Sequence, residues 1–270
     1  MAGKVDLYDN AYARAEHELY RAIRSETYGQ DLGQTSWVTT EESERIPVLL
    51  NLTSDSTVLD VGCGSGLYAI HLAKHLRCRI AGVDANPHAV AGAAHLAAAA
   101  GLDGLAQFAQ CDVSSGLPFA DGSFDAAFAN DSLCHIPERT RLLRELFRVL
   151  RPGGRLLFSD ALVLGGVVSQ AELAIRTSIG LYFFSPPGEN ERLLVSAGFT
   201  VLSVSDTSEQ TAAIAGRWHE ARERRRTELI GIEGSERYEG LQRFLGCVHT
   251  LTSERRLLRF VYLAEKLRQP

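Results

Sequence analysis

Short apolar runs, each of a length suited to a buried strand, alternate with segments of helical pattern through the middle of the chain. Strands are predicted at residues 57–61, 79–83, 106–110, 124–129 and 155–159. Helices are predicted between them at residues 67–76, 87–100 and 138–150, with proline or glycine at many of the boundaries. This alternation predicts an α/β fold with a doubly wound sheet, right-handed crossovers, and a ligand site at the carboxyl ends of the strands.

Three regions interrupt the alternation. Residues 8–50 predict two helices joined by a loop at residues 28–37, and this region is too apolar and aromatic for a disordered arm. Residues 161–188 contain the apolar segment IGLYFFSPPG. A helical insert from residue 207 to about 247 separates two late strands, at residues 199–205 and 257–264. We expect the three regions to form a lid over the strand ends.

The length and composition predict one domain. A chain of 270 residues, of which 45% are hydrophobic and 23% charged, is long enough to bury one sizeable core. We expect a single domain over residues 1–270. Within it, residues 1–50 would form an N-terminal helical lid, residues 51–160 the cofactor-binding core, and residues 161–270 the substrate-cap insertions with the last two strands.

The charge and cysteine content exclude several partners and compartments. A formal net charge of -5 argues against a nucleic-acid-binding surface, and the basic run at residues 222–226 is interleaved with acids, which predicts a solvated helix face. The five cysteines lack CxxC spacing, and an odd number cannot form a complete disulfide framework. The sequence has neither an apolar stretch of transmembrane length nor a signal-peptide pattern. We expect a cytoplasmic protein with no nucleic-acid or membrane partner.

The most informative stretch is TVLDVGCGSG at residues 57–66, where a strand runs into a turn with glycines at Gly62, Gly64 and Gly66. Such glycines permit positive φ angles and remove the Cβ atoms that would keep a ligand from the backbone, while the next helix points free N–H groups at the ligand. The spacing differs from the G-x-G-x-x-G fingerprint of dinucleotide sites. Asp60, before the first glycine, would repel a phosphate but attract an ammonium or sulfonium group, which favours S-adenosylmethionine over NAD.

Polar residues follow the next two predicted strands at the same edge of the sheet. Asp84 ends the second strand, roughly twenty residues beyond the glycine turn, where a carboxylate can accept from both ribose hydroxyls. Taken alone, Asp84 could also be a strand-end or helix cap. Asn86 would lie near an adenine edge, although an Asn-Pro pair is also a common helix start. Asp112 can accept from an adenine amino group while Val113 offers its backbone N–H, or Asp112 can be a turn carboxylate.

The order of these motifs carries a family resemblance. VLDVGCGSG, GVDANP, QCDV, FDAAFANDSLCHI and LRPGGRLLFSD, which together span residues 58–160, resemble the motif series of class I S-adenosylmethionine-dependent methyltransferases. The resemblance implies a Rossmann-like, seven-stranded, mostly parallel sheet whose last strand is antiparallel. It also implies that Asp60 and the glycines hold the methionine portion of the cofactor and that Asp84 holds the ribose. Asp112 and Val113 would hold the adenine, and Asn130 joins these cofactor-binding residues.

A narrower resemblance lies at the edges of this core. The segments YDNAY and YGQDLGQTSW, together with NDSLCH after strand four, are similar to the small-molecule branch that contains sarcosine/dimethylglycine and phosphoethanolamine N-methyltransferases. In that branch an N-terminal tyrosine-bearing helix closes over the cofactor, and the aspartate and histidine after strand four face the substrate. The resemblance therefore implies catalytic positions for Tyr12, Asp131 and His135. The loop sequence GQTSW departs from that branch, so the acceptor is not inherited from it.

These three positions also have structural interpretations. His135 is suited to remove a proton because the ordinary pKa of histidine lies near neutrality, but it could instead pack in a short turn. Asp131 could hold a cationic substrate, orient His135, or cap a helix. Tyr12 could belong to the core of an amphipathic helix. No metal site is expected, because His71 and His75 lack an HExxH pattern and carboxylate partners.

The sequence thus predicts a methyltransferase that uses S-adenosyl-L-methionine, yields S-adenosyl-L-homocysteine, and methylates O or N of a small metabolite such as a natural-product intermediate. The aromatic residues Trp37, Tyr182 and Trp218 suggest a partly hydrophobic acceptor, or equally a packed core. Two alternatives stay open. One is a dehydrogenase, and the other is a cofactor-binding relative with a non-methylating role such as cyclisation or regulation. Either a monomer or a homodimer is expected.

Overall fold

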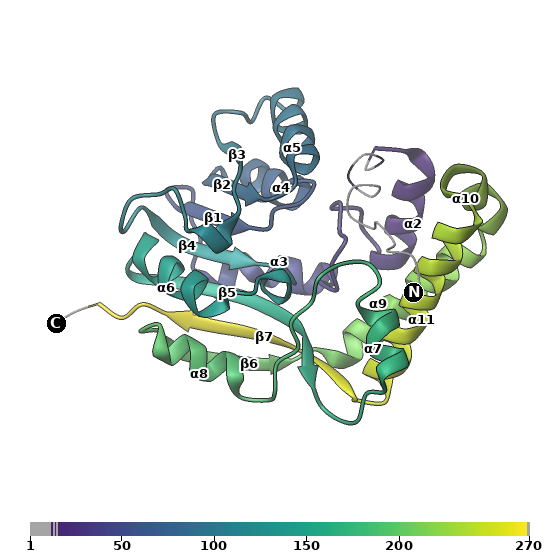
Figure 1. Cartoon of the computed structure of the whole chain (residues 1–270). Helices are drawn as coiled ribbons and strands as arrows, with labels where there is room; N and C mark the ends of the chain where they lie inside the picture. Colours follow the sequence, from purple (N-terminus) through teal and green to yellow (C-terminus); the bar gives the residue numbers. More distant parts are fainter. Residues whose placement is uncertain (1–11, 13, 15, 269–270) are drawn as a thin grey trace.

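A seven-stranded sheet forms the centre of the computed structural model, which describes residues 12, 14 and 16–268 (Figure 1). The strands lie in the order β3-β2-β1-β4-β5-β7-β6. Their bounds are Thr57–Val61 (β1), Arg79–Asp84 (β2), Ala106–Gln110 (β3), Phe124–Ala129 (β4), Leu150–Leu164 (β5), Thr200–Asp206 (β6) and Leu257–Glu265 (β7). The predicted start of a helix at residue 8, and residues 8–11 of the YDNAY segment, lie outside the described residues.

The directions of the strands confirm the predicted fold class. β1 runs parallel to both of its neighbours, β2 and β4, and the parallel pairing continues to β3 and β5. β7 pairs in the antiparallel sense with β5 and β6, so the last strand of the chain runs against the others. Short 3-10 helices, η1 (Val113–Ser115) and η2 (Leu133–His135), follow β3 and β4. In a sheet of this kind the carboxyl ends of the central strands leave a crevice for a ligand.

β5 extends well beyond the predicted strand at residues 155–159. It begins directly after α6 (Arg139–Val149), so the PGG sequence at residues 152–154 lies inside the strand. The pairing with β4 shifts register between Phe124 and Ala126, and the proline therefore occupies an irregular part of the ladder, where its missing N–H is tolerated. At its other end β5 continues along β7, past the end of β4.

Helices cover both faces of the sheet, as the predicted doubly wound fold requires. α3 (Thr40–Leu49), α4 (Leu67–Leu76) and α5 (Pro87–Ala99) contribute apolar residues to one buried cluster with β1 and β2. α6 and α8 (Glu189–Ser196) contribute to a second cluster on the other face. In the described part of the chain, no helix combines the length and the apolar character needed to cross a membrane.

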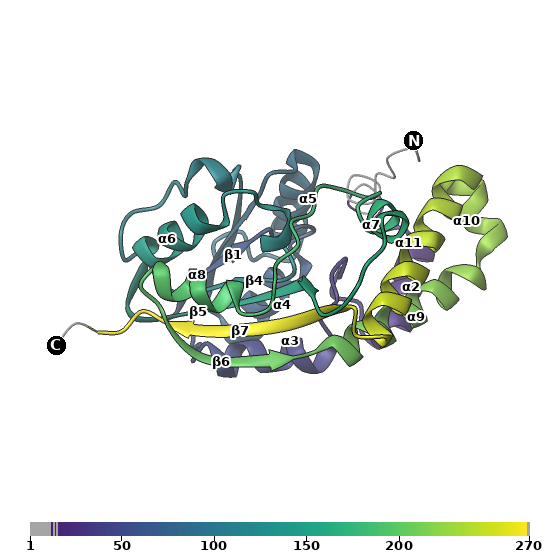
Figure 2. The ribbon, with the colours of Figure 1, turned by 60° about the horizontal axis from the view of Figure 1, so that its bottom comes forward.

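A further group of helices lies beyond one end of the sheet, on the right in Figures 1 and 2. This group, which we call the cap, consists of α2 (Glu18–Tyr28), α7 (Gln170–Arg176), α9 (Ser208–Glu223), α10 (Arg226–Glu233) and α11 (Ser235–Ser253). An aromatic core joins the cap to the loop between α2 and α3. In this core the ring of Trp37 lies 6.1 Å from that of Trp218 and 6.3 Å from that of Phe244. Segments from all three predicted lid regions therefore share one apolar core.

The basic run at residues 222–226 differs from its prediction at one position. The side chain of Arg222 is buried and forms an ion pair of 2.7 Å with Glu233, so the prediction of a solvated helix face is wrong for this residue. Arg224 and Arg226 are exposed, as predicted. The partner Glu233 belongs to α10, and the spacing of charges within α9 cannot reveal a pairing between two helices.

Candidate active site

A cavity of about 620 Å³ lies between the carboxyl ends of the central strands and the cap. Residues that follow the strands line one part of it, which we call the sheet half: Gly62, Asp84, Asn86, Asp112, Val113 and Asn130. Residues of the cap and of the turns beside it line the cap half: Trp37, His135, Arg176, Tyr182, Trp218 and Phe244. Cavities of this volume bind small organic ligands and cofactors.

The glycine turn after β1 approaches other segments so closely that side chains are excluded. Gly62 has a φ angle of +75°, and a Cβ atom there would lie 2.5 Å from the Cβ of Ser132. A Cβ atom on Gly64 would lie 2.9 Å from the hydroxyl of Tyr12. Gly66 differs, because it precedes α4, packs against α5 and the ring of Phe108, and lines neither this cavity nor its smaller neighbour. The structure therefore gives Gly66 a packing role.

The smaller cavity, of about 70 Å³, shares Gly62 and Asn130 with the larger one and is also lined by Asp60. Asp60 is 4% exposed, so burial raises the pKa of its carboxyl well above the usual range, and the charge of Asp84 raises this pKa further. Among the described residues, no Lys, Arg or His forms an ion pair with Asp60. An ammonium or sulfonium group would supply the missing positive charge, so this donor set fits S-adenosylmethionine.

Asp84 ends β2 and is held by two backbone donors. Its Oδ2 atom accepts a hydrogen bond of 2.9 Å from the Gly64 N–H, and its Oδ1 atom accepts one of 2.9 Å from the Asn86 N–H. Each carboxylate oxygen has a further lone pair that can accept from a ribose hydroxyl. Asn86 caps α5, where its Oδ1 atom accepts from the N–H groups of His88 and Ala89. The helix-start interpretation of Asn86 is confirmed, and the residue also lines the cavity.

Asp112 follows β3 and caps η1. Its Oδ1 atom accepts from the N–H of Ser114 at 3.0 Å and from the hydroxyl of the same residue at 2.5 Å, and these bonds lower the pKa of the carboxyl. The turn-carboxylate interpretation of Asp112 is confirmed. Asp112 and Val113 nevertheless line the sheet half of the cavity, and Asn130 lines both cavities.

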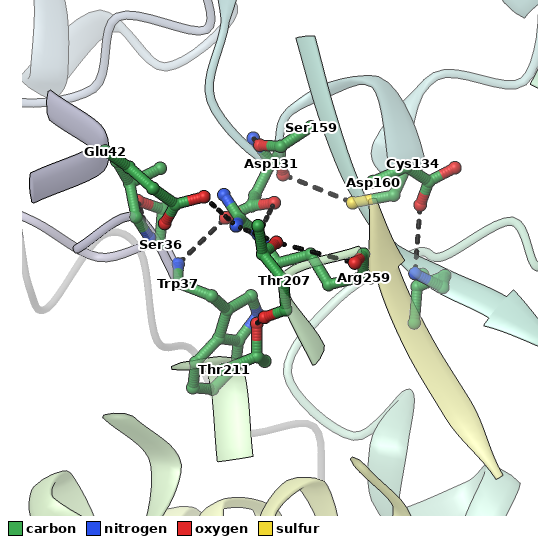
Figure 3. A network of polar contacts seen from close by, with 12 residues as sticks. Ser36, Trp37, Glu42, Asp131, Cys134, Ser159, Asp160, Thr207, Thr211 and Arg259 are labelled. Carbon is green, nitrogen blue, oxygen red and sulfur yellow. Dashed lines mark hydrogen bonds and ion pairs between the residues drawn. The ribbon is translucent and has the colours of Figure 1, made fainter. Parts of the chain in front are cut away.

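Asp131 belongs to a buried polar network that joins the sheet to the loop before α3 (Figure 3). Its Oδ1 atom accepts from Nε of Arg259 at 2.8 Å, and its Oδ2 atom accepts from the backbone N–H of Trp37 at 2.8 Å. Arg259 also forms an ion pair of 2.7 Å with Glu42. Asp131 has a φ angle of +53°, and its own N–H donates to the hydroxyl of Ser159.

This network revises the interpretation of Asp131. Its carboxylate is engaged by Arg259 and Trp37, while Nδ1 of His135 bonds to the carbonyl oxygen of Leu181 instead. The residue at the N-cap of η2 is Ser132, so the helix-cap interpretation of Asp131 is wrong. The geometry gives Asp131 the role of fixing the backbone at Trp37, and the charge of its carboxylate is already balanced by Arg259.

His135 ends η2, and its half-buried ring lies in the cap half of the cavity, 4.4 Å from the ring of Tyr182. Burial lowers the pKa of the imidazole, and the positive charge of Arg176 also lowers it, so the ring is neutral at pH 7. Nδ1 lies 2.8 Å from the carbonyl oxygen of Leu181. Because a carbonyl oxygen can only accept, Nδ1 carries the proton and Nε2 carries the lone pair that can take a proton.

Tyr12 lines both cavities, and its hydroxyl forms a hydrogen bond with the side chain of Thr35. Burial raises the pKa of the phenol, and the charge of Asp84 adds to this effect, so Tyr12 stays protonated at physiological pH. It is therefore unsuited to act as a general base. Its hydroxyl lies close to Gly64, which places it over the glycine turn.

Sequence patterning missed three residues that shape this site. Arg176 from α7 and Phe244 from α11 line the cap half, and Arg259 from β7 neutralises Asp131. The available signals were weak. Arg176 interrupts an apolar segment, and Arg259 occupies an inward-facing position of an otherwise apolar strand, where a charged residue needs a partner.

Comparison with known proteins gives the same class as the fold and the cavity. Residues 59–158 match a family model described as a methyltransferase domain. The chain is 30% identical over 244 residues to 27-O-demethylrifamycin SV methyltransferase of Amycolatopsis mediterranei, covering 84% of this chain and 88% of that protein. It is also 30% identical over 191 residues to sarcosine/dimethylglycine N-methyltransferase of Halorhodospira halochloris, covering 71% of this chain and 68% of that protein.

A solved structure with the same fold is phosphoethanolamine N-methyltransferase 2 of Haemonchus contortus, in complex with phosphomonomethylethanolamine and S-adenosylhomocysteine. The TM-score is 0.80 at 20% identity, over 98% of this chain and 61% of that chain. The fold and the glycine-lined cavity define a class I S-adenosylmethionine-dependent methyltransferase. The chain belongs to this family, in its small-molecule branch, with S-adenosylmethionine as cofactor and S-adenosylhomocysteine as product. The dehydrogenase alternative is wrong.

Proposed function

We propose that this methyltransferase acts on an oxygen atom of a largely apolar natural-product acceptor. The observation that carries the proposal is the cap half of the cavity, which is lined by four aromatic rings and one neutral imidazole, that of His135. A ligand site with apolar walls and few polar anchors suits an apolar acceptor with a reactive hydroxyl. Support also comes from 27-O-demethylrifamycin SV methyltransferase, whose name gives an O-demethylated natural product as its acceptor.

The charges around the cap half favour oxygen over a cationic amine. Asp131 is already paired with Arg259, and Arg176 adds a positive charge to the cavity wall. The other acids among the described lining residues, Asp84 and Asp112, lie in the sheet half. A positive wall repels an ammonium acceptor, whereas it lowers the pKa of an acidic hydroxyl and so favours its ionised form.

His135 is the proposed general base. With Nδ1 donating to Leu181, the lone pair of Nε2 takes the proton from the acceptor hydroxyl as that oxygen attacks. The lowered pKa of His135 keeps the ring unprotonated at neutral pH. Because the same shift weakens the base, the positive charge of Arg176 matters for ionising the hydroxyl. A base of this kind contributes about 10²–10⁴-fold to the rate.

The sheet half and the smaller cavity are proposed to hold the cofactor. Asp60 would balance the positive charge of the methionine portion, Asp84 would accept from the ribose hydroxyls, and Asp112 would face the adenine beside Val113. Bound S-adenosylmethionine supplies an electrophilic methyl group. Tyr12 would cover the glycine turn and hold the methionine portion in place.

The cap is proposed to align the acceptor and exclude water. Its walls come from residues 1–50 and 161–270, the regions predicted as lid and substrate cap. The hydrogen bond from the Trp37 N–H to Asp131 ties one of these walls to the end of β4. Alignment and exclusion of water are the main requirements of an in-line methyl transfer.

Product analysis tests this proposal. The purified chain is incubated with S-adenosylmethionine and hydroxylated polyketides, each paired with its amine analogue, and S-adenosylhomocysteine release is measured with the site of methylation. His135→Ala is expected to lower kcat by at least about 10²-fold with unchanged S-adenosylhomocysteine affinity. His95→Ala, at an exposed position of α5, is the control. Preferential methylation of the amines would contradict the proposal, and conversion of an acceptor without S-adenosylhomocysteine release would support the cyclisation alternative.

A further inference from the structure

We infer that Arg176 binds a negatively charged oxygen group of the acceptor, so that the substrate carries a carboxylate or an ionisable phenol or enol within the cap half of the cavity. The inference rests on the proposed function, because it assigns a chemical class to the acceptor in the same cavity. It depends on three observations: Arg176 is buried, Glu172 on the same helix is engaged elsewhere, and Arg176 lines the same part of the cavity as His135.

Arg176 is 2% exposed, and none of the acidic residues that the structure describes forms an ion pair with it. Its Nε and Nη1 atoms are buried and make no hydrogen bond with any residue that the structure describes. Arginine is rarely buried unless it is paired, because an uncompensated guanidinium in a low-dielectric site is costly. A guanidinium kept in this state on a cavity wall is suited to pair with a charged group of the ligand.

Glu172, an acidic residue on the same helix as Arg176, is engaged elsewhere. Glu172 lies four residues earlier on α7, a spacing that favours ion pairs on a helix. Its carboxylate accepts from the Ser169 N–H at 2.8 Å in a capping box, and it forms an ion pair of 2.7 Å with Arg256. The charge of Arg176 is therefore left for the cavity.

Two aromatic rings hold the guanidinium against the wall. The Cζ atom of Arg176 lies 4.5 Å from the ring centroid of Tyr182 and 5.0 Å from that of Phe244. Cation–π contacts of this kind fix the position of the guanidinium, but they do not give its N–H groups a hydrogen-bond acceptor. The ring of Tyr182 also contacts that of His135, so an acceptor whose hydroxyl meets His135 brings a neighbouring group within reach of Arg176.

The carboxylate of the cofactor is a less suitable partner. Arg176 lines the cap half and does not line the smaller cavity around Asp60, where the methionine portion is proposed to lie. Among the described residues that line the large cavity, Arg176 is the one arginine or lysine. The anion that pairs with it therefore comes from the acceptor.

Calorimetric titration of the protein saturated with S-adenosylhomocysteine tests the inference without catalysis. Cinnamate and cinnamamide share an apolar skeleton and differ in charge, and 4-nitrophenolate with 4-nitroanisole forms the corresponding phenol pair. The wild type is expected to bind at least one anion about tenfold more tightly than its neutral partner, because a hydrogen bond between two ions is among the strongest. The pair that gives the larger ratio of anion affinity to neutral affinity shows whether the site prefers a carboxylate or a phenolate.

Substitutions of Arg176 test whether the charge of this residue causes the ratio of affinities. Arg176→Met is expected to reduce the ratio to about one, and Arg176→Lys to retain part of it. Arg243→Met, at an exposed position of α11 beside Phe244, is the matched control and should keep the full ratio. Unchanged S-adenosylhomocysteine affinity shows that each variant is folded.

The inference is contradicted if the wild type binds neither anion, or binds each anion no more tightly than its neutral partner. A ratio that persists in Arg176→Met would also contradict it. Failure of the proposed function has a different signature, since the anion preference would remain while the methylation assay yields no O-methylated product.

Discussion

The Nε atom of Arg259 lies 2.8 Å from Oδ1 of Asp131, and both side chains are buried. Arg259 comes from the last strand, whereas Asp131 lies two residues after the end of β4, beside the cavity. The other carboxylate oxygen of Asp131 accepts from the Trp37 N–H, and Arg259 also pairs with Glu42 on α3. One ion-pair network thus ties the sheet to an aromatic wall of the cavity (Figure 3).

Removing the cation from this network is expected to lower the free energy of unfolding by more than removing one acid does. Asp131→Asn, which keeps the shape and tolerates a φ angle of +53°, should lower the free energy of unfolding by about 1.5–3 kcal/mol, because Glu42 still pairs with Arg259. Arg259→Met leaves the buried carboxylate of Asp131 and the half-buried carboxylate of Glu42 without this cation, and should lower the free energy of unfolding by about 3–5 kcal/mol. Urea unfolding measures both values, and a larger loss in Asp131→Asn would contradict this account.

Two glycine substitutions are expected to act in opposite directions. Gly62→Ala forces a side chain into the left-handed region at φ +75°, 2.5 Å from the Cβ of Ser132, so it should destabilise the protein by at least about 1–2 kcal/mol and weaken S-adenosylhomocysteine binding. Gly92→Ala, within α5, meets no atom within 4 Å and should stabilise the protein by about 0.5–1 kcal/mol. Thermal unfolding and calorimetry test both, and unchanged binding in Gly62→Ala would remove Gly62 from the cofactor site.

Cofactor binding is expected to release a proton from Asp60. Because the pKa of this carboxyl is raised, the stability of the free protein falls as pH rises through that pKa. A cationic ligand favours the ionised carboxylate and so offsets this loss of stability. The affinity for S-adenosylmethionine should therefore rise with pH between the ordinary value of 3.8 and the raised pKa, then level off. Asp60→Asn should bind more weakly and without this dependence. Calorimetry in buffers of different ionisation enthalpy measures the proton, and proton uptake would contradict the assignment.

The acid limb of the pH–rate profile is expected to report His135. The lowered pKa places the limb of kcat/KM below the ordinary histidine value of 6.5, with full activity at pH 7. Arg176→Met removes a positive charge that helps to lower this pKa, so the limb should move to higher pH, whereas Arg243→Met should leave it in place. S-adenosylhomocysteine release from pH 5 to 8 measures the limb. A shift to lower pH in Arg176→Met would contradict the role of His135.

The sheet could be predicted from the sequence because local patterns specify it. The apolar run that ends at Asp60 and the strand that ends at Asp84 form β1 and β2, and the parallel topology brings these two carboxylates to one edge. Asn86 and Asp112 likewise lie where their motifs place them, and both also cap a neighbouring helix.

The cap half could not be predicted in the same way, because its contacts join residues far apart in the chain. The partner of Asp131 lies 128 residues later, in β7, and no motif links the two positions. The role of Arg176 could not be predicted either, because it depends on the lack of an ion-pair partner among the described residues. That lack follows from the ion pair between Glu172 and Arg256, which only the structure reveals. Pairing between distant segments thus decides the charges at this end of the cavity.

The most direct test of the account is the structure of the methylated product. A hydroxylated aromatic polyketide that carries a carboxylate is incubated with the protein and S-adenosylmethionine, and the product is identified by mass spectrometry and NMR. The account predicts equal amounts of S-adenosylhomocysteine and of a product methylated on oxygen, with the rate strongly reduced in His135→Ala. Methylation on nitrogen or carbon, or conversion of the acceptor without release of S-adenosylhomocysteine, would contradict it.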